Sequence, residues 1–158
     1  IAGNICISSD EIDNKRMRDA AHMACIDEFV DSLPLKYNTV IGMEGKGISQ
    51  GQRQRILIAR AIYKNPEYIF LDEATNSLDA TNEANIMTNL QQFYKGRTAV
   101  ISAHRLSTVR NAHQIVVMNG GKIVELGTHE SLLKKRGRYY ELVKHQMTDE
   151  TKENIKLV

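Results

Sequence analysis

Apolar residues recur along this chain in two patterns, one typical of helices and the other typical of strands. Between Met17 and Cys25 they recur at helical spacing. The apolar stripe then continues as far as Pro34, which ends it. This first part of the chain therefore predicts a pair of helices that pack on their neighbours.

Short continuous apolar runs follow, and each of them predicts a strand. The run Tyr68–Leu71 is typical of a strand buried on both faces in a parallel sheet. Further strands are predicted at 97–102, at 114–118 and, after the hairpin signal Asn119-Gly120-Gly121, at 122–126. A helix capped by Thr128 is predicted at 130–135 and another at 139–146. Helices and strands that alternate in this way indicate an α/β fold.

Composition limits the classes of protein that fit. The chain has 158 residues, of which 42% are hydrophobic and 25% charged, as expected for one soluble globular domain. A formal charge of +2 is too small to indicate nucleic acid or an anionic membrane surface as the main partner. Cys6 and Cys25 lack the CxxC spacing and are expected to be reduced thiols. No apolar run is long enough to cross a bilayer, and a first residue Ile1 suggests a piece of a longer protein.

The first candidate for chemistry is the segment that contains Ser49 and Gln52. Serine followed three residues later by glutamine predicts a helix that starts with a capping box. Gly51 leaves the first-turn amides uncovered, and the helix start carries partial positive charge, which suits a terminal phosphate. An ordinary capped helix has the same pattern. The arginines that follow, before Pro66, fit a solvated helix face.

The second candidate is the carboxyl end of the predicted sheet. Asp72 and Glu73 follow the apolar run 68–71, and ligands of open α/β sheets bind outside the carboxyl ends of strands. An aspartate there can hold Mg²⁺, often through water, and the next carboxylate can orient or deprotonate an attacking water. His104 follows the next predicted strand, which places its imidazole at the same edge. Each of these signals alone is common.

Together these motifs are far more specific. In their order and spacing, Ile48–Gln52, Tyr68–Glu73, Ser77–Asp79 and His104 resemble the nucleotide-binding domain of an ABC transporter. The resemblance implies an α/β fold, namely part of a P-loop NTPase (RecA-like) core with parallel strands and an ABC-type α-helical subdomain.

The resemblance also implies a domain organisation. Residues 1–146 correspond to the C-terminal part of the nucleotide-binding domain. Within it, 10–64 correspond to the helical subdomain with the signature helix, and 65–146 to the part of the core with Walker B, D-loop and switch histidine. Residues 147–158 are left as a polar, solvated or frayed tail.

By the same resemblance the chain binds ATP and Mg²⁺. Glu73 is the catalytic glutamate, His104 is the switch histidine that contacts the γ-phosphate, and Asp72 holds the metal through water. The implied nucleotide-binding residues of the signature and the D-loop are Ser49, Gln50, Gly51, Gln52, Ser77 and Asp79.

Two departures from the family pattern stand out. The signature has Ile48 and Gln50 where the family usually shows Leu and Gly, whereas Ser49 and Gly51, the positions expected to face phosphate, are kept. The P-loop pattern GxxxxGK[ST] occurs nowhere in these residues. We expect the P-loop, the adenine-stacking aromatic residue and the Q-loop glutamine upstream of Ile1. Because phosphoryl transfer depends on positioning and charge neutralisation, we expect the chain to be inactive alone.

The run from Arg97 to Val109 and the segment 125–130 resemble exporter-type members of the family. The resemblance implies an ATPase that powers transmembrane export, with a second nucleotide-binding domain in a head-to-tail dimer and a transmembrane domain as partners. The resemblance also implies that the domain lies at the cytoplasmic face of the plasma (inner) membrane, as part of an integral membrane protein. The segment from Ser49 to Arg60 is similar to bacterial peptide or bacteriocin exporters, some of which carry a cysteine-peptidase domain. The expected cargo is a peptide or another hydrophobic or amphipathic molecule.

Two other classes share parts of this pattern. An ABC-type ATPase acting on DNA or ribosomes would add coiled-coil arms or strongly basic stretches, and neither the charge balance nor heptad spacing indicates them here, so no nucleic-acid partner is expected. A truncated, non-catalytic binding or regulatory module is the third class.

Overall fold

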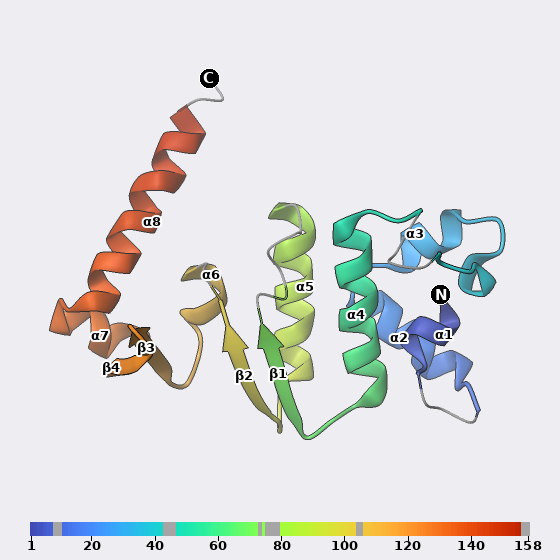
Figure 1. Ribbon diagram of the computed structural model, residues 1–158, viewed down its shortest axis with the longest axis horizontal. Helices are drawn as coiled ribbons and strands as arrows, with labels where there is room; N and C mark the ends of the chain where they lie inside the picture. Colours follow the sequence, from blue (N-terminus) through green and yellow to red (C-terminus); the bar gives the residue numbers. More distant parts are fainter. Residues whose placement is uncertain (8–10, 43–46, 73, 75–79, 104–105, 156–158) are drawn as a thin grey trace. The chain divides into compact units, whose positions relative to one another are not determined.

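The computed structural model describes residues 1–7, 11–42, 47–72, 74, 80–103 and 106–155. The chain divides into two compact units, residues 1–102 and residues 103–158. Figure 1 labels the helices and strands of both units. This division follows compactness, and the functional boundaries after residues 64 and 146 remain predictions.

The first unit combines helices with a two-stranded parallel sheet. Its elements in chain order are α1 (Ala2–Ile5), α2 (Asn14–Met23), α3 (Asp27–Ser32), the 3-10 helix η1 (Lys36–Asn38), α4 (Gln50–Lys64), β1 (Tyr68–Asp72), α5 (Ala80–Phe93) and β2 (Thr98–Ser102). The helical pair predicted before Pro34 is confirmed as α2 and α3.

The start of α2 is fixed by Asp13. Its carboxylate accepts hydrogen bonds from the backbone N–H groups of Lys15 and Arg16, both at 3.0 Å, so that it caps the helix. The backbone N–H of Asp13 donates to the hydroxyl of Tyr63 on α4 at 3.2 Å. The cap of α2 is thus also a contact with the helix that carries the candidate phosphate segment.

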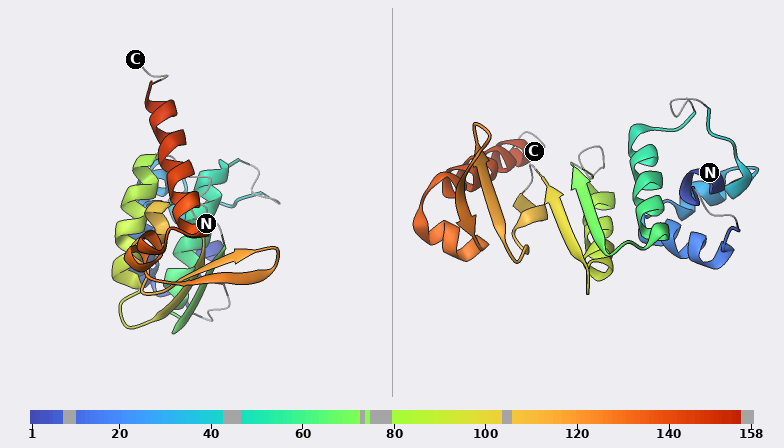
Figure 2. Two further views of the ribbon diagram at one scale, coloured as in Figure 1. Left: turned by 90° about the vertical axis from the view of Figure 1, so that its left-hand side faces the viewer. Right: turned by 60° about the horizontal axis from the view of Figure 1, so that its bottom comes forward.

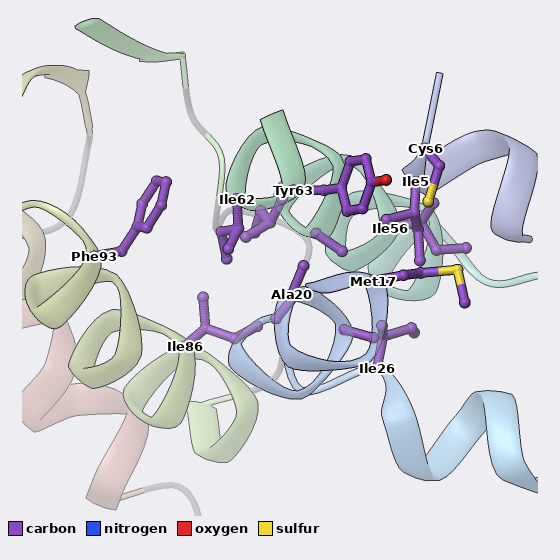
Figure 3. Packing of buried hydrophobic residues seen from close by; sticks show 14 of the residues in the cluster. Ile5, Cys6, Met17, Ala20, Ile26, Ile56, Ile62, Tyr63, Ile86 and Phe93 are labelled. Atoms are coloured by element: carbon purple, nitrogen blue, oxygen red, sulfur yellow. The ribbon is translucent and has the colours of Figure 1, made fainter. Parts of the chain in front are cut away.

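Helices α2, α4 and α5 share one hydrophobic core. Figure 3 shows Ala20 of α2, Ile62 of α4 and Ile86 of α5 in a single cluster, and all three are buried. Large apolar side chains such as Ile86, which has no exposed surface, each stabilise the fold by roughly 1.5–3 kcal/mol. This core holds the start of α4 and the sheet in one unit.

Two arginines of α4 fasten it to its neighbours. The Arg55 guanidinium donates to the backbone carbonyl of Cys25, just after α2, at 2.6 Å. The Arg60 guanidinium donates to the carbonyl of Asn4 in α1, also at 2.6 Å. The interpretation of the helix arginines as a solvated face is therefore wrong for these two residues, because carbonyls near the ends of helices lack intrahelical partners and attract cationic donors.

The predicted parallel pairing of the first two strands is confirmed. Strand β1 pairs with β2 in parallel, with Tyr68 opposite Thr98 and Asp72 opposite Ser102. The two carboxyl ends therefore lie side by side, as expected for a site at the edge of an α/β sheet.

The prediction that β1 is buried on both faces is wrong. Ile69 is 4% exposed, whereas Tyr68 and Phe70 on the opposite face are 66% and 76% exposed. On the same face of β2, Val100 is 53% exposed. Alternate side chains of a strand point to opposite faces, and among the described residues only one face of this sheet is packed on the core. Apolar side chains of Tyr68, Phe70 and Val100 are therefore exposed on the other face of the sheet.

The second unit is built on the predicted hairpin. Its elements are α6 (Leu106–Val109), β3 (Ile115–Asn119), β4 (Lys122–Gly127), α7 (His129–Lys135) and α8 (Arg138–Ile155). Strands β3 and β4 are antiparallel, and Gly120 and Gly121 between them have φ angles of 55° and 73°. Two consecutive positive φ angles are the requirement of a type I′ turn, so the hairpin prediction is confirmed.

One face of this hairpin packs on α7 and α8, whose arrangement Figure 2 shows from two sides. The buried cluster consists of Ile115, Val117, Leu132, Tyr139 and Val143. Glu125 of β4 is also buried and forms a hydrogen bond with the start of α8. An acid between apolar residues of a strand here serves as the cap of a neighbouring helix.

The C-terminal part differs from the expectation. Thr128 caps α7 through a capping box with Ser131, as predicted. Helix α8, in contrast, continues to Ile155, so most of the segment predicted as a polar tail from 147 has helical backbone. The polar sequence gave no apolar stripe from which this extension could be predicted.

Candidate functional site

The phosphate-binding segment predicted at Ser49 lies at the start of α4. The Ser49 hydroxyl accepts a hydrogen bond from the backbone N–H of Gln52 at 3.1 Å, and the Gln52 side-chain oxygen accepts one from the backbone N–H of Ser49 at 2.8 Å. The capping box is therefore present as predicted.

This cap determines which amides remain available. Of the first backbone N–H groups of α4, those of Ser49 and Gln52 are used by the cap. In the described part of the chain, no hydrogen bond engages the N–H groups of Gln50 and Gly51. No acidic residue occupies the first turn, and Ser49 and Gln50 are exposed to solvent. Two amides, a hydroxyl proton and the helix dipole can thus meet an anion at this position.

Ile48 anchors the segment from the inside. Its side chain is partly buried and packs against the core cluster of the first unit. Gly47, directly before it, has a φ of +96°, a conformation that favours glycine. The isoleucine at this position therefore still provides an inward apolar contact, while Ser49 remains at the surface.

The second predicted group of residues begins at the end of β1. Asp72 is exposed, and its Cα position pairs with that of Ser102 at the end of β2. Four predicted site residues, Glu73, Ser77, Asp79 and His104, lie outside the described residues. The register of the sheet nevertheless places Asp72 beside the strand end that His104 follows two residues later in the sequence.

Asp72 is better suited to binding Mg²⁺ through water than to forming part of a site in which the protein supplies every ligand. Among the described residues, no three His, Cys, Asp or Glu side chains are grouped closely enough to hold a metal ion. Mg²⁺ commonly keeps several waters and uses one or two carboxylates together with substrate phosphates. A single exposed carboxylate at the carboxyl edge of a parallel sheet is compatible with that mode.

The described contacts do not join the two halves of the site. Helix α4 and strand β1 follow each other and run in opposite directions, so that the start of α4 and the end of β1 lie at the same end of the first unit (Figure 1). No hydrogen bond or ion pair that the structure describes connects Ser49 with Asp72. Ser49 is positioned by the start of α4, and Asp72 by the end of β1.

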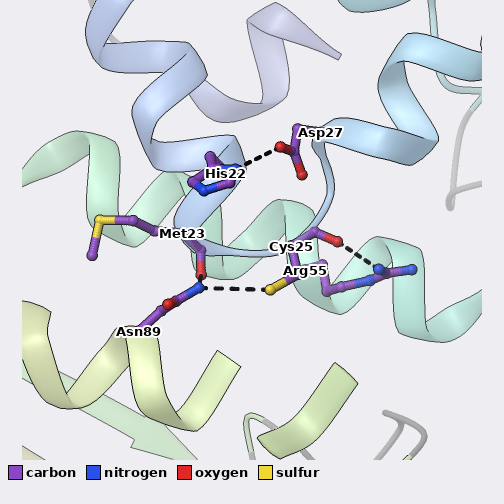
Figure 4. Close-up of polar contacts among 6 residues, drawn as sticks. All are labelled: His22, Met23, Cys25, Asp27, Arg55 and Asn89. Atoms are coloured by element: carbon purple, nitrogen blue, oxygen red, sulfur yellow. Dashed lines mark hydrogen bonds and ion pairs between the residues drawn. The ribbon is translucent and has the colours of Figure 1, made fainter. Parts of the chain in front are cut away.

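Sequence reasoning missed a polar cluster around the turn after α2. Figure 4 shows Arg55 of α4 and Asn89 of α5 converging on the turn after α2. Next to them the His22 ring nitrogen Nδ1 lies 2.7 Å from the Asp27 carboxylate. This hydrogen bond, together with the negative charge of Asp27, raises the pKa of His22. Only the helical spacing of these positions was visible in the sequence, and it does not indicate their partners.

Comparisons with known proteins agree with this geometry. The family described as ABC transporter matches residues 4–76. An ATP-dependent lipid A-core flippase from Saccharophagus degradans is 47% identical over 148 residues, which cover 94% of this chain and 25% of that protein. A mitochondrial potassium channel ATP-binding subunit from Homo sapiens is 48% identical over 149 residues, covering 94% of this chain and 20% of that protein.

A solved structure supports the same assignment. A bacterial Atm1-family ABC exporter with ATP bound is similar with a TM-score of 0.88 and 35% sequence identity, over 92% of this chain and 26% of that one. The fold class is thus the α/β P-loop NTPase fold of an ABC nucleotide-binding domain, as predicted. The chain belongs to the ABC transporter family, and the solved structure that it resembles is an ABC exporter.

The chain spans about a quarter or less of the length of these relatives. None of the helices in its described part combines the length and the apolar character that crossing a bilayer requires. The similarity to exporters favours transport over the alternative of an ATPase acting on DNA or ribosomes.

Proposed function

We propose that this chain supplies the signature segment and the water-activating carboxylate of an ATPase that powers export across a membrane. The observation that carries the proposal is the start of α4, where Ser49 and Gln50 are exposed and the capping box does not use the amides of Gln50 and Gly51. These groups are suited to the γ-phosphate of ATP held by a second nucleotide-binding domain.

The catalytic roles follow from the sheet edge. Bound Mg²⁺ would neutralise negative charge on the phosphates. Asp72 would hold the water shell of that ion, and Glu73 would orient and polarise the attacking water. His104 contacts the γ-phosphate and the opposing D-loop around Asp79. These roles are extended to this chain from its family motifs, residue by residue.

The proposal includes a partner, because the phosphate cradle lies outside these residues. No GxxxxGK[ST] occurs in the chain, and the backbone and lysine of that motif neutralise the β- and γ-phosphates. We infer that two nucleotide-binding domains meet head to tail, each signature closing over ATP held by the other. The 158-residue chain alone is then inactive.

The transported molecule is expected to be amphipathic. One relative is named as a lipid A-core flippase, and the signature helix resembles those of peptide exporters. Lipid-like and peptide cargoes share a polar and an apolar part, which is the property we assign to the cargo. A transmembrane domain of the same or a partner chain would carry it, with the nucleotide-binding domain at the cytoplasmic face of the plasma (inner) membrane.

The test is ATP hydrolysis by the intact protein with and without Glu73. Glu73→Gln should abolish turnover and trap an ATP-bound closed dimer, because the amide no longer polarises the water. Glu67→Gln is the matched control, since Glu67 is exposed and precedes the opposite end of β1. Hydrolysis at the parental rate by Glu73→Gln would show that the base is wrongly assigned. Turnover by the isolated chain that Glu73→Gln abolishes would contradict the need for a partner.

A further inference from the structure

We propose that the turn between α2 and α3 is a junction that fixes helix α4 relative to helix α5, with Arg55 and Asn89 as its positioning residues. The junction consists of Met23, Ala24, Cys25 and Ile26. Its consequence for ATP hydrolysis rests on the proposed function, whereas its mechanical role can be tested independently.

Two helices donate hydrogen bonds to this junction. From α4, the Arg55 guanidinium donates to the Cys25 carbonyl at 2.6 Å. From α5, the Asn89 side-chain amide donates to the Met23 carbonyl at 3.0 Å and lies 3.6 Å from the Cys25 sulfur. Figure 4 shows both side chains reaching the same turn from different helices.

The junction itself is well defined. Ala24 and Ile26 have no exposed surface, so the turn is anchored in the core. Cys25 between them has a φ of 52°, which is unfavourable for a residue with a side chain and persists only where the surroundings impose it. The N–H of Ile26 donates to the Ala21 carbonyl at 3.0 Å and closes the turn.

The hydrogen bonds of Arg55 and Asn89 fix the positions of the two helices more closely than apolar packing does. Apolar packing is non-directional and permits small shifts of one helix along another, whereas a hydrogen bond fixes both distance and angle. The Met23 and Cys25 carbonyls lie at the end of α2, where carbonyls lack intrahelical partners. Arg55 and Asn89 satisfy them, and a shift of either helix would break these bonds.

The two fastened helices begin at the two segments that we assign to nucleotide. Ser49 is the N-cap of helix α4, and Arg55 follows within the second turn of that helix. Helix α5 starts at Ala80, directly after Asp79 in the sequence. Asn89 lies in the second half of α5, so the junction fixes this helix as a whole, which follows the D-loop in the sequence, relative to the signature.

The first test is a double-mutant cycle on the unfolding equilibrium of the 158-residue chain. If the junction acts as one unit, the effects of Arg55→Met and Asn89→Ala on the unfolding equilibrium constant deviate from multiplicativity by more than about twofold. Arg60→Met is the matched control, because Arg60 lies on the same helix and loses a similar bond, but to Asn4 of α1. Multiplicative effects of Arg55→Met and Asn89→Ala, or equal coupling of Arg60→Met with Asn89→Ala, would overturn the proposal.

The second test remains informative where a variant is strongly destabilised. The half-buried Cys25 thiol reports on the junction, and buried Cys6 serves as an internal reference. Iodoacetamide labelling followed by mass spectrometry should show severalfold faster alkylation of Cys25 in Asn89→Ala and Arg55→Met, but not in Arg60→Met. Arg55→Lys keeps a donor and should restore part of the protection. Equal acceleration of Cys25 and Cys6 in all variants would indicate general loosening and refute the junction.

The functional test uses the intact protein. Asn89→Ala should lower kcat for ATP hydrolysis more than it changes KM, because the spacing matters most in the closed, reacting dimer. An unchanged kcat together with faster Cys25 alkylation would overturn the link between junction and catalysis. A parent without ATPase activity would refute the proposed function, and the results on the isolated chain would still decide the junction.

Discussion

Glu125 accepts a hydrogen bond from the backbone N–H of Tyr139 at 2.8 Å, and its side chain is buried. Helix α8 starts at Arg138, so this carboxylate caps the helix from another element. Glu125→Ala should lower the free energy of unfolding of the second unit by about 1–2 kcal/mol, since a first-turn N–H loses its acceptor. Glu125→Gln should lower it by less than about 1 kcal/mol, because only the charge facing the helix dipole is lost.

Urea unfolding followed by circular dichroism measures both variants of Glu125, and exchange of the Tyr139 amide reports the local contact. Glu130→Gln on the exposed face of α7 is the control. An alanine variant with parental stability and parental protection of that amide would show that the buried carboxylate is not a cap.

Gly137 allows this cap to form. A Cβ atom added at Gly137 would lie 1.8 Å from a carboxylate oxygen of Glu125, far inside contact distance. Gly137→Ala should therefore displace the carboxylate and destabilise the second unit by at least as much as Glu125→Ala. Gly3→Ala is the control, because no atom lies within 4 Å of the added Cβ and alanine is favoured over glycine in a helix. Thermal unfolding distinguishes the two alanine variants, and equal melting temperatures would contradict the overlap.

Two substitutions of Ser49 should distinguish its role as a helix cap from its proposed role in phosphate binding. Ser49→Ala removes the acceptor of the Gln52 N–H and should cost about 0.5–2 kcal/mol of stability. Ser49→Asp retains a capping oxygen but places a negative charge where we expect the γ-phosphate. It should keep the parental melting temperature of the chain and lower ATP hydrolysis by the intact protein more strongly than alanine does. If Ser49→Asp hydrolyses ATP as fast as the parent, the start of α4 does not contact phosphate.

His22 should make a small, pH-dependent contribution. Its pKa is raised by the hydrogen bond to Asp27 and by the charges of Asp27 and Asp19. A raised pKa means that the folded state prefers the imidazolium. The stabilisation is fully present below the unfolded pKa of about 6.5 and is lost as the pH rises through the folded pKa. Since the His22 side chain is 78% exposed and solvent screens the pair, the contribution should stay below about 1 kcal/mol.

Titration of the His22 ring by NMR tests this pair directly. Asp27→Asn should move the pKa of His22 down toward its ordinary value. Asp31→Asn should leave it unchanged, because Asp31 lies on the same helix but pairs with Lys36. A His22 pKa that does not respond to Asp27→Asn would show that the contact is not populated in solution.

Phe70 and Ile69 should respond in opposite ways to the same substitution. Phe70 is 76% exposed and Ile69 is 4% exposed, on opposite faces of β1. Phe70→Thr should reduce concentration-dependent association of the isolated chain and change its stability by no more than about 0.5 kcal/mol. Ile69→Thr should cost at least about 2 kcal/mol, because a cavity forms and a hydroxyl is buried. Light scattering and urea unfolding together measure the contrast, and equal responses would contradict the asymmetry of the sheet.

Local structure was predictable wherever the signal is local. The caps at Ser49 and Thr128 and the turn at Gly120 and Gly121 each depend on residues within four positions of one another. Likewise, the alternation of helices and apolar runs was sufficient to predict the α/β fold and the parallel pairing of the strands at Tyr68 and Thr98.

Contacts between distant residues were not predictable from pattern. Arg55 and Asn89 look like solvated helix positions in the sequence, and their acceptors are backbone carbonyls, which carry no sequence signal. The burial of Glu125 depends on the absence of a side chain at Gly137, twelve positions later along the chain. The exposure of Phe70 depends on how many layers cover the sheet, which an apolar run alone cannot indicate.

For the candidate site, the order of the motifs in the sequence was sufficient to select the residues, whereas the fold was needed to place them in space. The sequence predicted Ser49 as a cap and Asp72 at a strand end, and the structure confirms both placements. The roles of all predicted site residues remain predictions, and Glu73, Ser77, Asp79 and His104 also lie outside the described part of the chain.

The hairpin turn at Gly120 and Gly121 has a consequence for the order of folding. Among the described residues, the buried core of the second unit lies between Ile115 and Val143, with partly buried Val109 packed against it, so its contacts close short loops. In the first unit, Arg60 meets Asn4 across 56 positions and Asn89 meets Met23 across 66. Closing longer loops costs more entropy, and folding slows as contacts become less local. The second unit is therefore expected to form early, and assembly of α1, α2, α4 and α5 is expected to limit the rate at which the chain becomes native.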